Sequence, residues 1–254
     1  MKPKPIKFVA FGDNHGDLAD PEACDALEAF VKDYKPDERI HLGDCFDFRS
    51  LRQGVGAHDA ESTESHKADL DAGLDFIRRF RPTVYLMGNH EARLHRLITQ
   101  SSSAMIRDYC TDIQDAIHRE ARKVGVRKIY QYHAEKGVHR LGPVAFIHGY
   151  AVGKNATELQ GLHYATQGGG LIHGHTHNLS SVALTRHGSG NAFSAGCLCQ
   201  KQAMDYAAHR LATSRWGSGF VAGWIHGDEW KAWLVHKVGD RWVWTSQLTF
   251  WEPK

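Results

Sequence analysis

Residues 6–15 read IKFVAFGDNH, and this stretch decides the fold class. An apolar run ends in a glycine, and Asp13, Asn14 and His15 follow it at once. A short apolar run of this kind is typical of a buried strand. Residues i and i+2 of an extended backbone point to the same side, so the Asp13 carboxylate and the His15 imidazole should converge. The stretch therefore predicts a strand that ends in a chemically capable pair.

The same pattern returns twice further along the chain. RIHLG, at residues 39–43, precedes Asp44, and TVYLM, at residues 83–87, precedes Gly88-Asn89-His90. Helical spacing of apolar residues separates these strands, at residues 21–34 and again in the segment that ends near Phe80. The order strand–helix–strand–helix–strand predicts an α/β fold. Such a fold carries its functional side chains on the loops that follow the carboxyl ends of the strands.

The second half of the chain predicts more elements of both kinds. Apolar spacing favours a helix over 101–124, a strand over 144–147 that ends at His148, and a short helix over 156–165. Leu171-Ile172 then leads into His-Gly-His-Thr-His. No repeat or linker interrupts the sequence, so we expect one domain over residues 1–254. Within it, 91–135 is a candidate cap segment over the site, and 181–254 should form mainly β hairpins, with turns at Gly227-Asp228 and Gly239-Asp240.

The composition excludes several classes of protein. The 254 residues carry a net charge of +2 and are 42% hydrophobic, which excludes a disordered chain and a strongly basic nucleic-acid coat. No apolar run is long enough to span a membrane, and the N-terminus does not resemble a secretory signal. An odd number of scattered cysteines favours reduced thiols in a cytoplasmic protein. We interpret Cys197 and Cys199 as packing residues.

Five short motifs carry the chemistry. They are Asp13-x-His15, Gly43-Asp44-x-x-Asp47, Gly88-Asn89-His90-Glu91, His148-Gly149 and Gly174-His175-x-His177. Each one alone is more often a turn or a packed side chain. Together they supply a mixed set of oxygen and nitrogen donors, which suits divalent Mn, Fe, Ni or Zn. The set lacks thiolates, so it does not predict a structural zinc finger.

The order of these motifs, over residues 13–177, resembles the calcineurin-like metallophosphoesterase superfamily. The resemblance implies a four-layer α/β/β/α sandwich with a dinuclear metal centre at the strand ends. It also implies a metal-dependent phosphoesterase, which hydrolyses phosphate mono- or diesters by in-line attack of a metal-bridging hydroxide. The expected cofactors are two divalent metal ions, with Mn first and Fe, Ni or Zn as alternatives.

The resemblance also implies a role for each motif residue. His90 is expected to be the general acid, and Asp47 is expected to orient it. Asp44 should bridge the two metals. The remaining ligands are Asp13, His15 and His177 for one metal, and Asn89, His148 and His175 for the other.

Three further residues are candidate substrate contacts. Arg49 and Arg93 could bind phosphate, and the alternative is that each is a solvated surface arginine. Trp216 could line the rim of the site and stack on a base or a sugar, and the alternative is sheet packing. Phe48 occupies a place where the protein phosphatases of this superfamily carry an arginine, which weakens a protein-phosphatase assignment.

Two other functions compete with the phosphoesterase hypothesis. A nucleic-acid processing nuclease of the same superfamily would need a basic groove, which the net charge does not indicate. A non-catalytic metal-binding scaffold would be expected to have lost the acid or a ligand, yet His90 and Asp47 are both present. The expected partner is therefore a phosphate-ester substrate. The sequence predicts no membrane association and sets no oligomeric state.

Overall fold

A computed structural model describes residues 4–53, 65–185, 190–201 and 215–244. The helices are α1 (Pro21–Tyr34), α3 (His66–Phe80), α4 (Ala92–Gln100), α5 (Ala104–Lys123) and α6 (Ala156–Tyr164), with single 3₁₀ turns η1 (Gly16–Leu18) and η2 (Arg49–Leu51). The strands are β1 (Ile6–Phe11), β2 (Glu38–His41), β3 (Val84–Leu86), β4 (Lys128–Tyr130), β5 (His139–Leu141), β6 (Val144–Ile147), β7 (Gly170–His173), β8 (Leu179–Leu184), β9 (Gly190–Ala195), β10 (Gly219–His226), β11 (Glu229–Val238) and β12 (Arg241–Val243).

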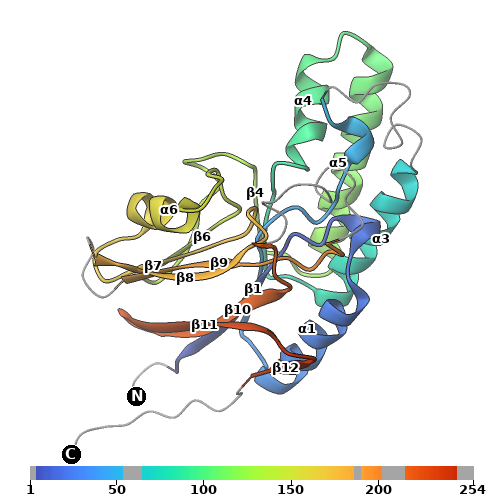
Figure 1. The fold of residues 1–254 in the computed structure, drawn as a ribbon. Helices are drawn as coiled ribbons and strands as arrows, with labels where there is room; N and C mark the ends of the chain where they lie inside the picture. Colours follow the sequence, from blue (N-terminus) through green and yellow to red (C-terminus); the bar gives the residue numbers. More distant parts are fainter. Residues whose placement is uncertain (1–3, 54–64, 186–189, 202–214, 245–254) are drawn as a thin grey trace, which may run out of the picture.

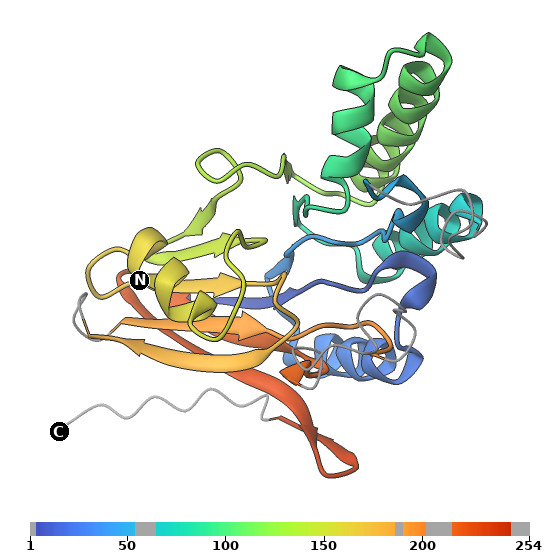
Figure 2. The same cartoon turned by 45° about the horizontal axis from the view of Figure 1, so that its top comes forward.

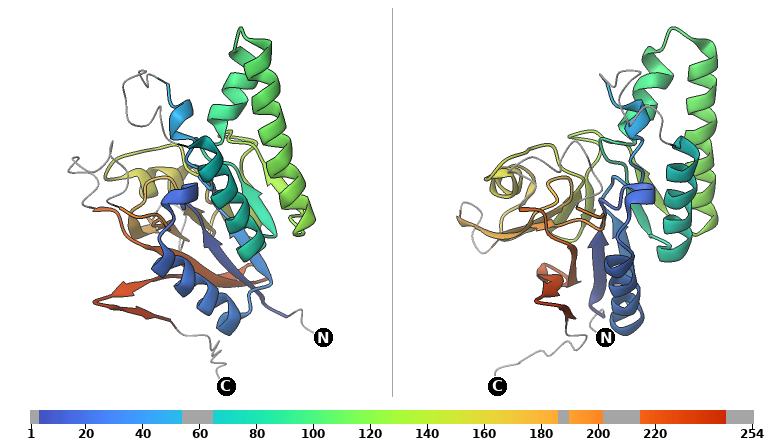
Figure 3. Two further views of the ribbon diagram at one scale, coloured as in Figure 1. Left: turned by 90° about the vertical axis from the view of Figure 1, so that its right-hand side faces the viewer. Right: turned by 45° about the vertical axis from the view of Figure 1, so that its right-hand side comes forward.

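Two sheets stack on each other between layers of helices (Figure 1). The first sheet has the order β12-β11-β10-β1-β2-β3-β4, and the second has the order β5-β6-β7-β9-β8. Helices α1, α3 and α5 cover the outer face of the first sheet, and α6 covers the second (Figures 1 and 3). The expected four-layer α/β/β/α architecture is confirmed.

Successive side chains of a strand point to opposite faces of the sheet, and this alternation places them in different layers of the core. In β1, Val9 and Phe11 pack under the helices, while Phe8 and Ala10 face the second sheet. All four side chains are fully buried. A strand covered on both faces needs apolar side chains at every position, which explains why this run lacks the polar alternation of an exposed strand.

The strands next to the site run parallel. β1 pairs in parallel with β2, β2 with β3, and β6 with β7. The carboxyl ends of parallel neighbours lie at the same edge of a sheet, so the loops after them share one end of the molecule. The predicted strands and helices that fall on described residues appear, with ends shifted by a few residues. Of the β-hairpin segment predicted over 181–254, residues 186–189, 202–214 and 245–254 lie outside the described residues.

The segment 91–135 contains more structure than the sequence predicted. The predicted helix over 101–124 is α5, but the shorter helix α4 precedes it and was missed. These two helices pack against each other and project from the rest of the fold (Figure 2). Whether they cap the site stays a prediction. Of the helices within the described ranges, none combines the length and the apolar character that crossing a bilayer demands.

Candidate metal centre

The loops after β1, β2, β3, β6 and β7 bring the five sequence motifs together. Five of the motif residues occupy left-handed backbone conformations: Asp13, His15, Asp44, His175 and His177, with φ between 50° and 69°. Such a conformation costs a non-glycine residue of order 1 kcal/mol, and it persists only where the surrounding structure imposes it. Backbone strain in the described residues is thus concentrated where the candidate ligands lie.

Glycines in the motifs leave room for ligands from other motifs. A Cβ on Gly88 would lie 2.1 Å from Asp44 Oδ1, and one on Gly174 would lie 2.4 Å from Asp13 Oδ2. A Cβ on Gly43 would lie 2.5 Å from His148 Nδ1. Any side chain at these three positions would displace a candidate ligand, which gives a physical reason for the glycine in each motif.

The first group of ligands, which we call site A, consists of Asp13, His15 and His177. Nε2 of His15 faces Nε2 of His177 at 3.1 Å, and the latter lies 3.2 Å from Asp13 Oδ1. Nδ1 of His15 is 2.9 Å from Asp47 Oδ1 and donates to it, so the lone pair of a neutral His15 is on Nε2. Buried donor atoms that converge in this way suit a divalent cation, which would replace the proton shared by the two rings.

The second group, site B, consists of Asn89, His148 and His175. Nε2 of His148 lies 2.9 Å from Asn89 Oδ1 and 3.3 Å from Asp44 Oδ2, while Nδ1 of the same ring donates to the Leu42 carbonyl at 2.9 Å. His175 contributes a ring nitrogen within 4.8 Å of ligand atoms of both Asp44 and His148.

Asp44 lies between the two sites. Its carboxylate belongs to the compact group with Asp13 and His15, and also to the group with His148 and His175. One carboxylate thus reaches both sites, which is the position expected of a shared ligand.

The charges at these sites favour a cation. Burial lowers the pKa of His148, but Asp44 and the neighbouring carboxylates together raise this pKa to about 9. Burial also lowers the pKa of His177, but Asp13 and its neighbours together raise it to about 9. The carboxylates thus stabilise positive charge at both sites, and a metal ion could replace the bound protons.

His90 and Asp47 lie beside site A. Nδ1 of His90 is 3.0 Å from Asp47 Oδ1 and 2.6 Å from the Asp47 carbonyl. Its backbone N–H donates to Asp44 Oδ1 at 2.9 Å. Burial lowers the pKa of His90, yet Asp44 and Asp47 together raise it above the ordinary value. The carboxylates thus favour a protonated ring, and the nearby Arg93 guanidinium opposes it.

The two predicted phosphate-binding arginines differ. Arg93 donates to the carbonyls of Asp47 and Phe48 at 2.7 and 3.1 Å, and its Nη2 lies 3.2 Å from His90 Nε2. Arg49 instead forms two bonds to the Asp17 carboxylate, at 2.8 and 2.7 Å. Its Nη1 atom also lies 3.6 Å from Asp47 Oδ2, so Arg49 is held beside the site and is not a solvated surface arginine. Phosphate binding by Arg49 and by Arg93 stays a prediction.

An aromatic ring flanks each site. The Trp216 ring packs edge-on against His177, with ring centroids 4.2 Å apart. The Tyr132 ring lies 5.6 Å from that of His148 and donates its hydroxyl to the Gly149 carbonyl at 3.1 Å. Trp216 was predicted from the sequence as a candidate substrate contact. Tyr132 was not predicted, since no motif surrounds Tyr132.

Two buried carboxylates hold the site loops in place. Glu91 accepts hydrogen bonds from the backbone N–H groups of Cys45 and Gly88, both at 2.7 Å. Asp69 accepts from the backbone N–H groups of Asp47 and Phe48, at 2.9 and 2.6 Å. The motif pointed to Glu91 without giving it a role. Asp69 lies in the first turn of α3, and its sequence context carries no signal.

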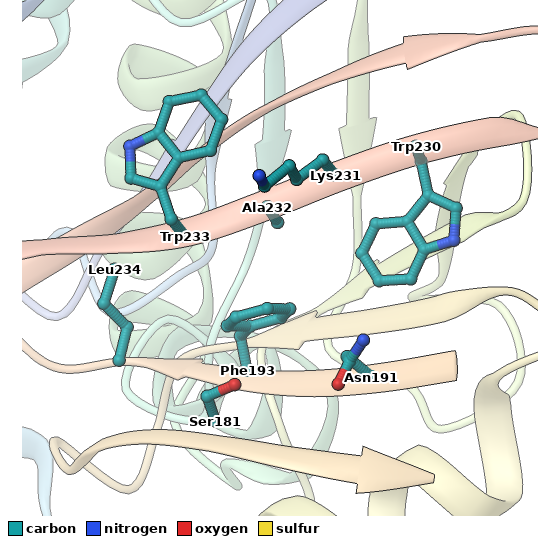
Figure 4. A pocket seen from close by; sticks show the side chains of 8 residues that line it. All are labelled: Ser181, Asn191, Phe193, Trp230, Lys231, Ala232, Trp233 and Leu234. Atoms are coloured by element: carbon teal, nitrogen blue, oxygen red, sulfur yellow. The ribbon is translucent and has the colours of Figure 1, made fainter. Parts of the chain in front are cut away.

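A separate hollow of about 450 Å³ lies between β11 and the strands β8 and β9 (Figure 4). Trp230, Trp233 and Phe193 line it together with polar side chains, but no candidate ligand does. Trp230 donates its indole N–H to the Gly168 carbonyl at 2.9 Å. The hollow thus belongs to the contact between the two sheets and not to the metal centre.

The chain is similar to several known proteins. The Gene 54 protein of Mycobacterium phage L5 is 24% identical over 254 residues, covering 92% of this chain and 95% of the relative. The solved structure of zinc-bound Vps29 from Entamoeba histolytica is 12% identical, with a TM-score of 0.44 and coverage of 94% and 96%. The phosphoesterase YfcE from E. coli is 13% identical, with a TM-score of 0.40 and coverage of 86% and 91%. Residues 6–179 match the calcineurin-like phosphoesterase family, and the chain belongs to that family.

Proposed function

We propose that this chain is a phosphoric ester hydrolase that depends on two divalent metal ions. The observation that carries the proposal is the position of Asp44, whose carboxylate belongs to both compact ligand groups. Asp13, His15 and His177 would hold one ion, Asn89, His148 and His175 would hold the other, and Asp44 would contact both.

When bound, a pair of divalent ions lowers the pKa of water, orients the phosphate and neutralises its developing charge. Carboxylate, amide and imidazole donors suit Mn, Fe, Ni and Zn, and we propose Mn as the first ion to test. Asn89 is a neutral ligand and limits the negative charge that would face an anionic ester.

His90 would act as the general acid. Asp47 would orient the ring through Nδ1. Arg93 donates to Nε2 in the ester-free site, so Nε2 would take up the proton for the leaving alkoxide once that guanidinium turns to the phosphate. Asp44 and Asp47 raise the pKa of His90, which favours the protonated ring once Arg93 no longer donates to it. Arg93 lies beside Nε2, and we propose that its guanidinium binds a phosphate oxygen when the ester is present.

The test compares p-nitrophenyl phosphate with bis-p-nitrophenyl phosphate. Enzyme stripped with a chelator receives Mn, Ni, Zn or Mg, and the hydrolysis of each ester is then measured. Metal-restored cleavage supports the proposal. Preference for the monoester indicates a phosphatase. Preference for the diester indicates a phosphodiesterase or nuclease and leads to tests on nucleotides and single-stranded DNA.

Absence of turnover with both ions bound would contradict the proposal and favour the scaffold alternative. Failure to bind any ion would contradict both. All five cysteines are free, and we therefore propose a reducing, cytoplasmic setting for the enzyme. Recovery of a disulfide-linked form from cells would contradict this part of the proposal.

A further inference from the structure

One thiol lies against site A. The Cys199 side chain is completely buried, and its Sγ lies within 4.8 Å of ring nitrogens of both His15 and His177. This group of three donors comes from three distant parts of the sequence. The sequence predicted a packing role for Cys199 and gave no sign that it lies beside His15 and His177.

The backbone holds this segment at the site. The N–H of Leu198 donates to the carbonyl of Asp13 at 3.2 Å, and Cys199 forms an isolated antiparallel bridge with Ala19. The thiol is thus attached to the same loop that carries Asp13 and His15. Small movements of that loop would carry the sulfur atom and the other ligands together.

Cys197 packs against Cys199 and its thiol is hydrogen-bonded to that of Cys199, whereas the other three cysteines have different surroundings. Cys24 and Cys110 pack on helices in the main apolar core. The Cys45 thiol donates to the Gly73 carbonyl at 3.6 Å, and the Cys197 thiol donates to the Gly217 carbonyl at 3.7 Å. Among the described residues, only Cys199 belongs to a compact group of metal-ligating side chains.

A second observation at this site concerns His177. Its Nδ1 atom is buried and has no hydrogen-bond partner among the described residues, although the ring is only 4% exposed. Buried polar atoms are normally paired, so Nδ1 calls for an ordered water or a functional role. Nε2 of the same ring faces Asp13 and His15 and is the atom available to a cation at site A.

We propose that Cys199 is an additional ligand of the metal ion at site A, an inference that rests on the proposed dinuclear function. The thiol would release its proton to water as the sulfur–metal bond forms, so that the ligand is a thiolate. Site A would then offer sulfur, nitrogen and oxygen donors, whereas the described donors of site B are nitrogen and oxygen only.

This difference in donors predicts a division of metals. Thiolate is a soft ligand that favours Zn and disfavours hard ions, while carboxylate and amide donors accept Mn readily. When both ions are supplied, Zn should occupy site A and Mn should occupy site B. In such a mixture, Zn or Mn should fill both sites only when it is supplied in large excess over the other.

The test uses Co²⁺ and Zn²⁺ on the full chain after chelation. The first equivalent of Co²⁺ should produce a sulfur-to-cobalt charge-transfer band in the near ultraviolet. C199S should abolish that band and weaken the first Zn²⁺ binding event about tenfold, or ~1.4 kcal/mol. The matched control is C110S, which removes a buried thiol on α5 and should keep the band.

X-ray absorption of the wild-type chain with one Zn²⁺ gives a second measurement that does not depend on any variant folding. It should show one sulfur neighbour at about 2.3 Å. Bound Zn²⁺ with nitrogen and oxygen neighbours only would overturn the Cys199 proposal and leave the proposed function intact. Persistence of the cobalt band in folded C199S would also overturn it. A chain that binds no ion at all would overturn both.

Discussion

Sites A and B each contain two histidines, but the histidines are oriented by different partners. At site A, Nδ1 of His15 donates to the carboxylate of Asp47. At site B, Nδ1 of His148 donates to the neutral carbonyl of Leu42. A carboxylate partner raises the basicity of a metal-binding imidazole more than a carbonyl does. The comparison predicts that His15 is the more strongly donating ligand of these two histidines.

Asp47 also joins site A to the general acid. Its Oδ1 atom lies 2.9 Å from His15 Nδ1 and 3.0 Å from His90 Nδ1. Site B has no such link among the described contacts. A change of charge at site A should therefore be felt by His90, whereas a change at site B should reach it only through Asp44.

Asp44→Ala should disrupt site A and site B alike, since it removes the residue that both sites share. We expect loss of tight binding of both ions and a fall in turnover of more than ~10³-fold. Elemental analysis after gel filtration and an assay with the preferred ester measure the two effects. Asp25→Ala, which removes an exposed carboxylate on α1, is the matched control. Two tightly held ions in Asp44→Ala would refute the shared position.

His90→Ala tests whether acid catalysis can be separated from metal binding. Both ions should remain, while hydrolysis of alkyl phosphates should fall by about 10²–10⁴-fold. The p-nitrophenyl esters should suffer much less, because their leaving group departs without a proton. The exposed neighbour His95, changed to alanine, provides the control. An equal loss on both kinds of ester would contradict the role of His90 as an acid.

Site residues with a local sequence signal could be predicted, whereas contacts between residues far apart in the sequence could not. The motif residues were found because each directly follows a strand, and parallel strands bring their carboxyl ends together. The pairing of Arg49 with Asp17 could not be found, since it joins residues 32 positions apart without any periodic pattern.

The same reasoning applies to α4, Asp69 and Cys199. Helix α4 spans nine residues rich in arginine and was missed because its apolar face is short. Asp69 and Cys199 reach the site only through the packing of α3 and of the segment after β9. Their roles depend on tertiary structure, whereas the five motifs carry a local signal.

Glu91→Gln tests whether metal affinity at site B can be lowered more than metal affinity at site A. The carboxylate of Glu91 accepts backbone N–H groups from the loops that carry Asp44 and Asn89. An amide nitrogen cannot accept a hydrogen bond, so at least one of these N–H groups loses its partner. We expect metal affinity to fall about 10–100-fold at site B and less at site A. Calorimetric titration resolves the two events, and an equal fall at both sites would contradict this assignment.

Asp69→Asn gives the smallest effect and tests the loop beside site A. Burial raises the pKa of Asp69 from 3.8 to about 6, so the folded chain binds this proton more tightly than the unfolded chain does. The stabilisation from this proton is complete below about pH 4 and is lost as the pH rises to about 6. Relative to the variant, the wild type should thus lose about 2 kcal/mol of unfolding free energy between pH 4 and pH 7. Urea denaturation of the metal-free proteins at each pH measures the difference. A difference that does not change with pH would show that Asp69 is ionised throughout, in which case its two backbone hydrogen bonds outweigh the cost of burial.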